Sequence, residues 1–353
     1  MIKVAEIWGD SIIRLAKELE ISTDNVTYIL LDFLNEIRYV VNNDAYNRIL
    51  EIAKRDNIPV YILTPYLREM PKLLNLDQDV RIIHWETFWF NRTHNAWKAH
   101  THTNLLKNLD MFSLRNGEDM TEFKYPYITL NNISKNHRCH IMDLLAKYNL
   151  IDMGAIAWRD INHACNDIRH TFTDGMIDSV YMGYKYKYWK PKRLILDQDI
   201  NDRFLQETMP KEFNDSFMQL VTESDDEVIF FSEKTATPIL LNKLFLIAGA
   251  KGYHTALKIR GFELYTELFD YGFDLESNDS LRYEGLIENI KRVCDMTPEV
   301  RTNMFKSVFE KIAYNKQHAL NLINDTPKEV TELLNLIRIE NKEPYTGPLN
   351  MLL

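Results

Sequence analysis

The sequence predicts an α/β fold made of two Rossmann-like halves, in which short parallel strands alternate with helices. Residues 1–124 alternate short apolar runs with segments of helical periodicity. Residues 125–160 follow the order strand, loop, helix, strand, and residues 228–252 hold two apolar runs on either side of a helix start. In such folds, ligands gather where strands end and helices begin.

Four apolar runs of the first half predict strands: Ile2–Ile7, Val26–Leu31, Val60–Thr64 and Val80–His84. Two intervening segments have helical periodicity: Ile12–Leu19 and Tyr46–Arg55. In the second half, strands are predicted at Tyr127–Leu130, Ala155–Trp158 and Leu244–Ala248, with a helix over Cys139–Tyr148 and a strand or loop over Val228–Phe231.

These elements indicate a first domain over residues 1–123 and a second over residues 124–297. Residues 298–340, helical in pattern over Glu299–Leu334, are expected to return and pack on the first domain. Residues 341–353 contain Pro344, Gly347 and Pro348 and are expected to be a tail.

Composition places the chain among soluble globular proteins. No apolar run reaches the roughly 18–20 residues needed to span a bilayer, and the first residues lack the pattern of a signal peptide. Cys139, Cys165 and Cys294 are far apart, which argues against a disulfide framework or a structural zinc site. We therefore expect a cytoplasmic protein with no membrane partner. A net charge of −9 disfavours a general nucleic-acid binder, although a local basic face can coexist with it.

The segment Ser232-Glu233-Lys234-Thr235 has the chemistry of a nucleotide-sugar site. Ser232 is a predicted N-cap, which places Glu233 and Lys234 in the first helical turn. The helix N-terminus and the Lys234 cation suit a phosphate, and Glu233 can accept hydrogen bonds from a ribose. The alternative is an ordinary solvated helix start.

The wider segment Leu220–Asp274 resembles the donor-binding half of GT-B glycosyltransferases, above all predicted glycosyltransferases of tailed phages. It is more distantly similar to the donor segment of fucosyltransferases. The shared positions are Thr222-Glu223, Ser232–Thr235, Pro238-Ile239, Leu244-Phe245, Gly249, Gly261-Phe262 and Phe273-Asp274. The sequence departs from the pattern at Thr237, where the group has a lysine, and at Phe273, where it has a tyrosine.

A second block that matches the same group is Leu130, Asn131, His137 and Arg138. Asn132 and Ser134 replace its usual basic and proline residues, while Lys135 retains a charge. Arg138 can bind a diphosphate bidentately; the alternative is a surface helix-cap residue. The resemblance thus implies a donor-binding set: Asn131, His137, Arg138, Glu223, Ser232, Glu233, Lys234 and Thr235.

Two other segments are candidates for acceptor binding. Gly183–Arg193 (GYKYKYWKPKR) alternates lysines with aromatic residues, so Lys185 and Lys187 could bind a nucleic-acid backbone. The alternative is an edge strand whose lysines discourage pairing. Ile83–His102 is rich in Trp and His, and we expect Trp85 and Trp89 to form an acceptor wall. Its histidines, among them His94, His100 and His102, lack the spacing of a zinc hydrolase, so a metal site is the less favoured alternative.

Glycosyl transfer with inversion needs a base for the acceptor hydroxyl. Asp10 follows the first predicted strand and is the first candidate, with Glu86 and His84 as the next. The alternative for Asp10 is the N-cap of the helix at Ile12. A metal-dependent GT-A enzyme would depend on Asp197 and Asp199, but their surroundings are typical of a strand end and turn.

The resemblance implies a GT-B-like glycosyltransferase with a cleft between two Rossmann-like domains and a nucleotide-sugar co-substrate, by default uridine diphosphate-linked. No cofactor or essential metal is expected. The suggested acceptor is a 5-hydroxymethyl pyrimidine in phage DNA, which would place the protein in the host cytoplasm. The alternatives are a saccharide or cell-surface glycan as acceptor, and a non-catalytic nucleotide-binding phage accessory protein.

Overall fold

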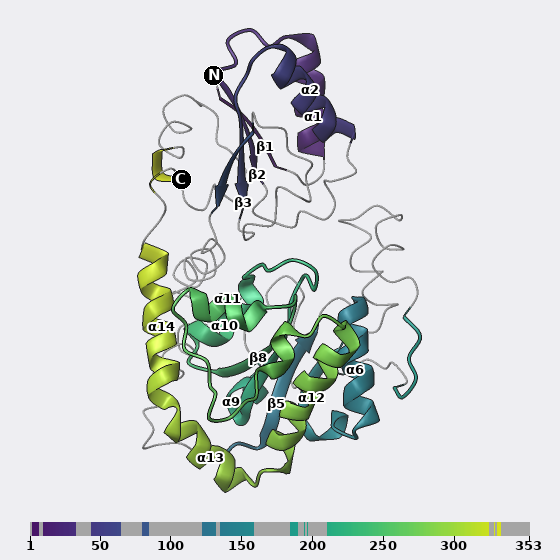
Figure 1. Ribbon diagram of the computed structural model, residues 1–353, viewed down its shortest axis with the longest axis vertical. Helices are drawn as coiled ribbons and strands as arrows, with labels where there is room; N and C mark the ends of the chain where they lie inside the picture. The colour runs from purple at the N-terminus through teal and green to yellow at the C-terminus, as the bar shows by residue number, and fades with distance from the viewer. Residues whose placement is uncertain are drawn as a thin grey trace. The chain divides into compact units, whose positions relative to one another are not determined.

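The computed structural model divides the chain into two compact units, Met1–Arg92 with Leu322–Leu353, and Thr93–Asn321. Figure 1 shows the elements of both units. The structure describes residues 2–6, 10–32, 44–64, 80–84, 122–131, 135–158, 184–189, 194, 196, 210–324, 328 and 330–332. The predicted domain boundary at residue 123 lies next to residues that are not among those described, so it stays a prediction.

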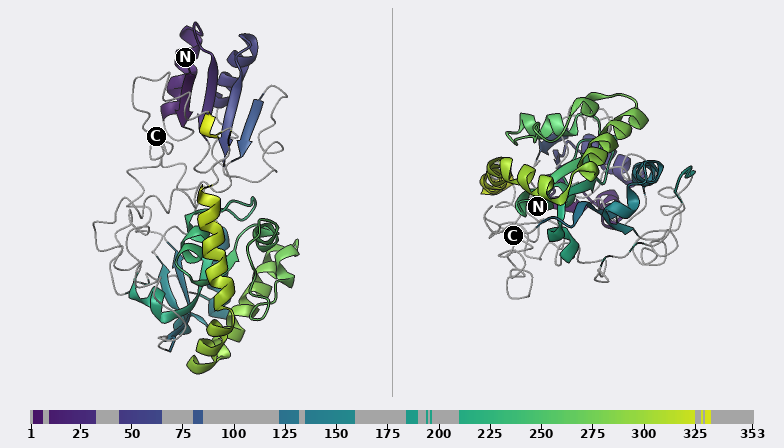
Figure 2. Two further views of the ribbon diagram at one scale, coloured as in Figure 1. Left: turned by 90° about the vertical axis from the view of Figure 1, so that its left-hand side faces the viewer. Right: turned by 90° about the horizontal axis from the view of Figure 1, so that it is seen from below.

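The first unit contains a parallel sheet whose strands follow chain order: β1 (Ile2–Glu6), β2 (Tyr28–Asp32), β3 (Val60–Thr64) and β4 (Val80–His84). Figure 2 shows these strands side by side. Helices α1 (Asp10–Ile21) and α2 (Asp44–Arg55) connect the first three strands and pack against each other. The predicted strands and helices are thus confirmed, with α1 beginning at Asp10 rather than at Ile12.

The second unit contains another parallel sheet, in the order β6-β5-β7-β8. Its strands are β5 (Tyr125–Asn131), β6 (Ala155–Trp158), β7 (Ser216–Thr222) and β8 (Leu244–Ala248). From β5 the chain moves to β6 on one side, and from β7 it moves to β8 on the other. The strand order therefore reverses between β5 and β7.

Helices α6 (Asn136–Lys147) and α10 (Glu233–Leu240) follow β5 and β7, respectively. Because crossovers between parallel strands are right-handed, and these two run in opposite directions along the sheet, α6 and α10 cover opposite faces. Helix α12 (Asp279–Asp295) packs on β5 and α6, and α10 packs on β7 and β8. Figure 1 agrees with this layering. The smaller elements of this unit are η1 (Ile151–Met153), α9 (Lys211–Asp215), α11 (Tyr253–Ile259) and η3 (Gly272–Leu275).

The core of this unit lies around β7 and β8, in which every residue is buried. Strands buried on both faces are typical of parallel sheets covered by helices. On β5, the Tyr127 ring is fully buried and its hydroxyl donates to the carbonyl of Leu150 at 2.8 Å. The chain is therefore a mixed α/β protein with parallel sheets, as predicted.

The C-terminal helical pattern forms two helices, α13 (Pro298–Ser307) and α14 (Phe309–Asn324). Helix α13 packs on the second sheet, because Arg301 donates to the carbonyl of Phe123 and Phe305 contacts the rings of Phe123 and Phe217. The residues that follow, up to residue 340, are expected to pack on the first domain, and this stays a prediction. None of the helices in the described ranges combines the length and apolar character needed to cross a lipid bilayer.

Val228–Phe231, predicted as a strand or a loop, is a loop. The strand in this region is β7, which the apolar pattern does not predict. Residues 184–189 form no strand, so the edge-strand explanation of their lysines is wrong.

Gly154 tests the packing against Tyr127. A Cβ at residue 154 would lie 2.3 Å from Cζ of the Tyr127 ring, which has no room to move. Gly154→Ala should therefore lower the free energy of unfolding by about 1–3 kcal/mol, measured by urea denaturation. Gly272→Ala is the matched control, since its nearest neighbour is the exposed side chain of Asp270. Equal stability of the two variants would contradict this packing.

Candidate ligand-binding site at the carboxyl ends of β5 and β7

The candidate site lies where the order of the second sheet reverses. Asn131 ends β5 and Thr222 ends β7, and the two strands are neighbours. The Thr222 hydroxyl donates to Oδ1 of Asn131 at 2.6 Å, and Nδ2 of Asn131 donates to Thr129 at 3.1 Å. In open α/β sheets, ligands bind beyond the carboxyl ends of strands at this kind of reversal. Asn131 is 3% exposed, so it serves to join the two strand ends.

Ser232 is the N-cap of α10, as the sequence predicts. Its hydroxyl accepts a hydrogen bond from the backbone N–H of Lys234 at 3.1 Å. The same hydroxyl donates to Oε2 of Glu223 at 2.6 Å. Thr235, in the first turn, donates to Oε1 of Glu223 at 2.5 Å. Both hydroxyls thus fasten the start of α10 to a single carboxylate.

Glu223 is that carboxylate, and its side chain is fully buried. Besides the two hydroxyls of α10, it accepts from the Tyr253 hydroxyl at 2.8 Å and from the backbone N–H of Ser224 at 2.9 Å. Four donors from the β7 loop, α10 and α11 therefore surround its two oxygens. Because a carboxylate offers about four lone pairs, Glu223 positions the helix starts and has no acceptor capacity left for a ligand.

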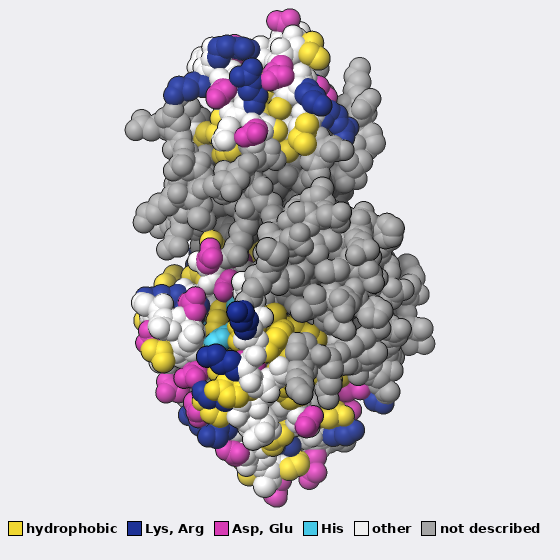
Figure 3. All heavy atoms as spheres, turned by 90° about the vertical axis from the view of Figure 1, so that its right-hand side faces the viewer, with side chains coloured by type: hydrophobic (Ala, Val, Ile, Leu, Met, Phe, Trp, Pro, Cys, Tyr) yellow, Lys and Arg dark blue, Asp and Glu magenta, His cyan; other side chains and the backbone are white. Residues whose placement is uncertain are grey.

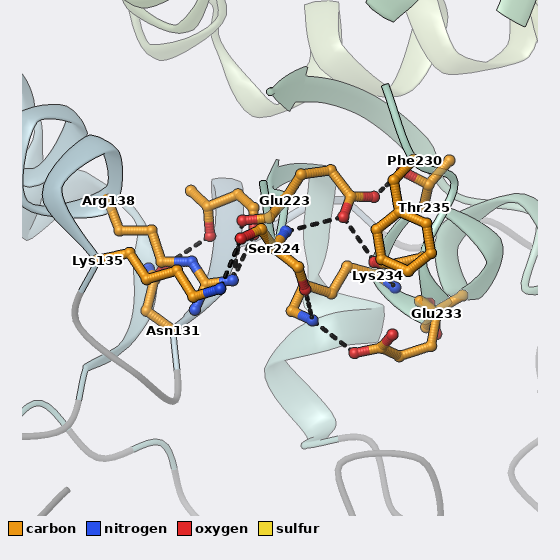
Figure 4. A network of polar contacts seen from close by, with 12 residues as sticks. Asn131, Lys135, Arg138, Glu223, Ser224, Phe230, Glu233, Lys234 and Thr235 are labelled. Carbon is orange, nitrogen blue, oxygen red and sulfur yellow. Dashed lines mark hydrogen bonds and ion pairs between the residues drawn. The ribbon is translucent and has the colours of Figure 1, made fainter. Parts of the chain in front are cut away.

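Three side chains from the start of α6 converge on the backbone carbonyls that follow β7. Lys135 Nζ donates to the carbonyl of Ser224 at 2.6 Å, and Arg138 Nη2 donates to the carbonyl of Glu223 at 2.9 Å. His137 Nε2 lies 2.8 Å from that same carbonyl, so this nitrogen carries a proton. Figure 4 shows Lys135 and Arg138 reaching Glu223 and Ser224 from one side and Lys234 from the other.

Burial determines the location of the Arg138 side chain and the charge of the His137 ring. Arg138 is 3% exposed, so its interpretation as a surface helix cap is wrong. Burial lowers the pKa of His137, and this outweighs the opposite effects of Asp226, whose Oδ1 lies 3.4 Å from Nδ1, and of the Glu223 carbonyl. His137 is therefore neutral at pH 7, and it acts as a hydrogen-bond donor rather than as a cation.

Glu233 and Lys234 form the more accessible part of the site, with about a quarter of each side chain exposed. Lys234 Nζ donates to the Glu233 carboxylate and, at 2.8 Å, to the Ser224 hydroxyl. The Thr237 hydroxyl, at the position where the resembling proteins have a lysine, donates to the carbonyl of Glu233 at 2.7 Å. Thr237 therefore contributes to its own helix and brings no charge to the site.

Asp274, the last shared position of the resemblance, is bound to α11. It accepts the backbone N–H groups of His254 at 3.0 Å and Thr255 at 2.9 Å. His254 Nδ1 lies 3.0 Å from Asp274, while His254 Nε2 accepts the backbone N–H of Ile247 at 3.2 Å. The proton of the neutral ring is thus on Nδ1, and Asp274 has a structural role as the anchor of α11.

The remaining predicted site residues are only partly placed. Asp10 is the first residue of α1, and for its side chain, as for that of His84 at the end of β4, no position is described. Lys185 and Lys187 are exposed. The following residues lie outside the described ranges: Trp85, Glu86, Trp89, His94, His100, His102, Asp197 and Asp199. Within those ranges, no group of three His, Cys, Asp or Glu side chains is arranged to hold a metal ion.

Sequence reasoning missed Ser224 and Tyr253 as members of the site. Ser224 follows Glu223 at the end of a strand that the apolar pattern does not predict, so its place beside Lys234 has no sequence signal. Tyr253 begins α11 after Gly252, which adopts a left-handed φ of 80°. The glycine marks a helix start, but nothing in the pattern indicates that the tyrosine hydroxyl turns toward Glu223.

Comparisons with protein-family models, curated proteins and solved structures find no match to this chain.

Acid titration tests the anchor at Asp274. Burial raises the pKa of this carboxyl, but hydrogen bonds from the ring and the backbone N–H of His254, with the N–H of Thr255, outweigh it and lower the pKa from 3.8 to about 2. Because the pKa of Asp274 is lower in the folded than in the unfolded chain, its ionised form stabilises the fold at any pH above the pKa of the unfolded chain. This stabilisation disappears as the pH falls from about 5 to about 2. The difference between wild type and Asp274→Asn in unfolding free energy should therefore shrink by about 2 kcal/mol over that range.

The measurement is urea denaturation at several pH values, with the exposed Asp270→Asn as matched control for the loss of a carboxylate. A difference between wild type and Asp274→Asn that stays constant from pH 6 to pH 2.5 would contradict the assigned role of Asp274.

Proposed function

We propose that this protein is a glycosyltransferase that moves a sugar from a nucleoside-diphosphate sugar to an acceptor hydroxyl. The observation that carries the proposal is the meeting of two helix starts and the side chains of Lys135, Arg138 and Lys234 at the reversal of the parallel sheet. The GT-B arrangement, with a donor domain and an acceptor domain on either side of a cleft, is part of the proposal.

The donor diphosphate would bind at the start of α10. A helix N-terminus carries a partial positive charge of roughly half a unit, and its N–H groups bind phosphate oxygens. The Lys234 ammonium, now bound to Glu233 and Ser224, can turn to the diphosphate. Glu233 would then accept hydrogen bonds from hydroxyl groups of the ribose or the sugar. One ligand would thus satisfy both partners of the existing ion pair.

The buried residues would support this binding without touching the diphosphate. Arg138 and His137 hold the carbonyls of Thr222 and Glu223, and Glu223 holds Ser232 and Thr235. These bonds fix the positions of the Ser224 hydroxyl and of the first turn of α10. A preformed arrangement of this kind stabilises developing charge without reorganisation during the reaction.

In the transfer, the bond between the anomeric carbon and the diphosphate oxygen breaks, and the anomeric carbon bonds to the acceptor oxygen. The diphosphate leaves with an additional negative charge, which Lys234 and the α10 start would stabilise. The acceptor proton goes to a base, for which Asp10 and Glu86 of the first unit are the candidates. A uridine diphosphate donor is our default, and the acceptor is a 5-hydroxymethyl pyrimidine of DNA or a saccharide.

Lys234→Ala tests the donor site. A ligand at about 100 times its Kd stabilises a protein by about 2.7 kcal/mol, so the matching nucleoside diphosphate or nucleotide sugar should raise the melting temperature of the wild type. We expect this shift to disappear in Lys234→Ala, and sugar transfer to lose roughly 2–4 kcal/mol of transition-state stabilisation. Lys258→Ala, at an exposed lysine of α11, is the matched control.

Equal shifts in Lys234→Ala and the wild type would rule out this donor site. Slow hydrolysis of the bound nucleotide sugar would support an enzyme, since many transferases hydrolyse their donor. Binding without hydrolysis or transfer would instead favour a nucleotide-binding module.

A further inference from the structure

The same unit contains a second segment that is held in place by many contacts, Tyr184–Trp189, called here the strap. Asp143 of α6 is 4% exposed and accepts three consecutive backbone N–H groups of the strap. The distances from its oxygens are 3.0 Å to N of Lys187, 2.7 Å to N of Tyr188 and 2.9 Å to N of Trp189. Burial raises the pKa of Asp143, but these hydrogen bonds outweigh it and lower the pKa. One ionised carboxylate therefore fastens half of the strap to α6.

Aromatic rings fasten the strap a second time. The rings of Tyr184 and Tyr186 meet edge to face with centroids 5.0 Å apart, and those of Tyr186 and Trp189 at 5.4 Å. Trp189 in turn meets Trp158, the last residue of β6, at 5.1 Å. The Tyr184 hydroxyl also lies 2.9 Å from Nδ1 of His140 on α6. These contacts hold the backbone of the strap in one conformation next to the carboxyl end of β6.

The strap turns its basic side chains outward. Lys185 and Lys187 are exposed, and the Tyr188 ring is 56% exposed. Neither ammonium has an ion-pair partner in the described part of the chain. Figure 3 views the protein from the side on which the strap lies in Figure 1, and Lys and Arg side chains occur on that face of this unit beside hydrophobic ones.

The geometry therefore points to a docking surface rather than to protection of a sheet edge. Lysines on an edge strand prevent pairing with another strand, but the strap is not a strand. An exposed aromatic ring next to exposed cationic side chains is what binding of a single-stranded nucleic acid uses: the cations bind phosphates and the ring stacks on a base. Since Lys185 and Lys187 are two residues apart, their Cα atoms are at most about 7 Å apart, which suits neighbouring phosphates.

We propose that the strap binds single-stranded nucleic acid, with Lys185 and Lys187 on the phosphates and Tyr188 stacked on a base. The net charge of −9 opposes general attraction of a polyanion, so binding depends on this local surface. The proposal uses none of the residues of the nucleotide-sugar site and holds whether or not the chain transfers a sugar. If it does, the strap assigns nucleic acid as the class of acceptor.

The test is the binding of a fluorescently labelled oligothymidine to the full-length protein, followed by anisotropy at several salt concentrations. For single strands, log K falls with log salt by about 0.7 per phosphate bound. Lys185→Ala/Lys187→Ala should thus reduce the slope by about 1.4. Lys258→Ala/Lys306→Ala, at exposed lysines of α11 and α13, removes the same charge elsewhere and should leave the slope unchanged.

Two further variants separate stacking and rigidity from charge. Tyr188→Ala should weaken oligothymidine binding by about fivefold or more but leave heparin binding unchanged, because heparin has no bases. Asp143→Asn removes a negative charge from the protein, which alone would strengthen binding of a polyanion, but it also releases the strap, so we expect weaker binding. If Asp143→Asn lowers the melting temperature too far, Tyr184→Phe is the substitute, because the Tyr184 hydroxyl lies 3.4 Å from Oδ2 of Asp143; it leaves the charge unchanged and should also weaken binding.

Several results would overturn the proposal: no oligothymidine binding at about 50 mM salt, an unchanged slope in the double lysine variant, or stronger binding by Asp143→Asn. Binding of heparin alone would point instead to an anionic glycan. Nucleotide-induced shifts in melting temperature report separately on Lys234. Failure of the strap and failure of the donor site are therefore distinguishable in the same set of proteins.

Discussion

The candidate site depends above all on the buried carboxylate of Glu223. Placing a charge away from water is strongly unfavourable unless hydrogen bonds compensate for it, and here three hydroxyls and one backbone N–H do so. These donors come from the loop after β7, from α10 and from α11. Any shift of one of these elements would leave the carboxylate with an unmet acceptor, so the three elements are fixed relative to one another.

The reversal of strand order explains why this carboxylate lies where a ligand can bind. The helices α6 and α10 leave β5 and β7 toward opposite faces of the sheet, so neither of them covers the ends of both strands. The Glu223–Ser224 segment lies between their first turns and receives hydrogen bonds from Lys135 on one side and Lys234 on the other. The topology thus brings two helix starts together, and the buried carboxylate fixes their positions.

The sequence predicts much of this fold because most strands are short apolar runs bounded by turn residues. The bounds of β3, β4, β6 and β8 agree with the prediction. β7 was missed because it contains Ser216 and Gln219, both buried, which obscure a continuous apolar run. Val228–Phe231 is more apolar but forms a loop, since Asp225 accepts the backbone N–H groups of Glu227 and Val228 and thereby turns the chain.

The residue types of the site could be predicted from the sequence, but the burial of its side chains could not. The N-cap role of Ser232 follows from local chemistry, because a serine before a helical segment binds the N–H groups that the helix leaves open. The burial of Arg138 and the four donors around Glu223 depend on contacts between residues that are far apart in the sequence. Periodicity does not reveal such contacts, which is why Arg138 could also be interpreted as a surface residue and Glu223 as a direct ligand contact.

Glu223, Asp274 and Asp143 share one physical design. Each is a buried carboxylate held by hydrogen bonds from a neighbouring loop or helix start. Asp143 and Asp274 accept several backbone N–H groups, whereas Glu223 accepts one backbone N–H and three hydroxyls. Among the described residues, none of the three is paired with a lysine or an arginine. Carboxylates of this kind fix loops without using the positive charges of the unit. Lys234, Lys185 and Lys187 therefore keep ammonium groups that an anion can reach, and the unit can have two cation-bearing surfaces despite its acidic chain.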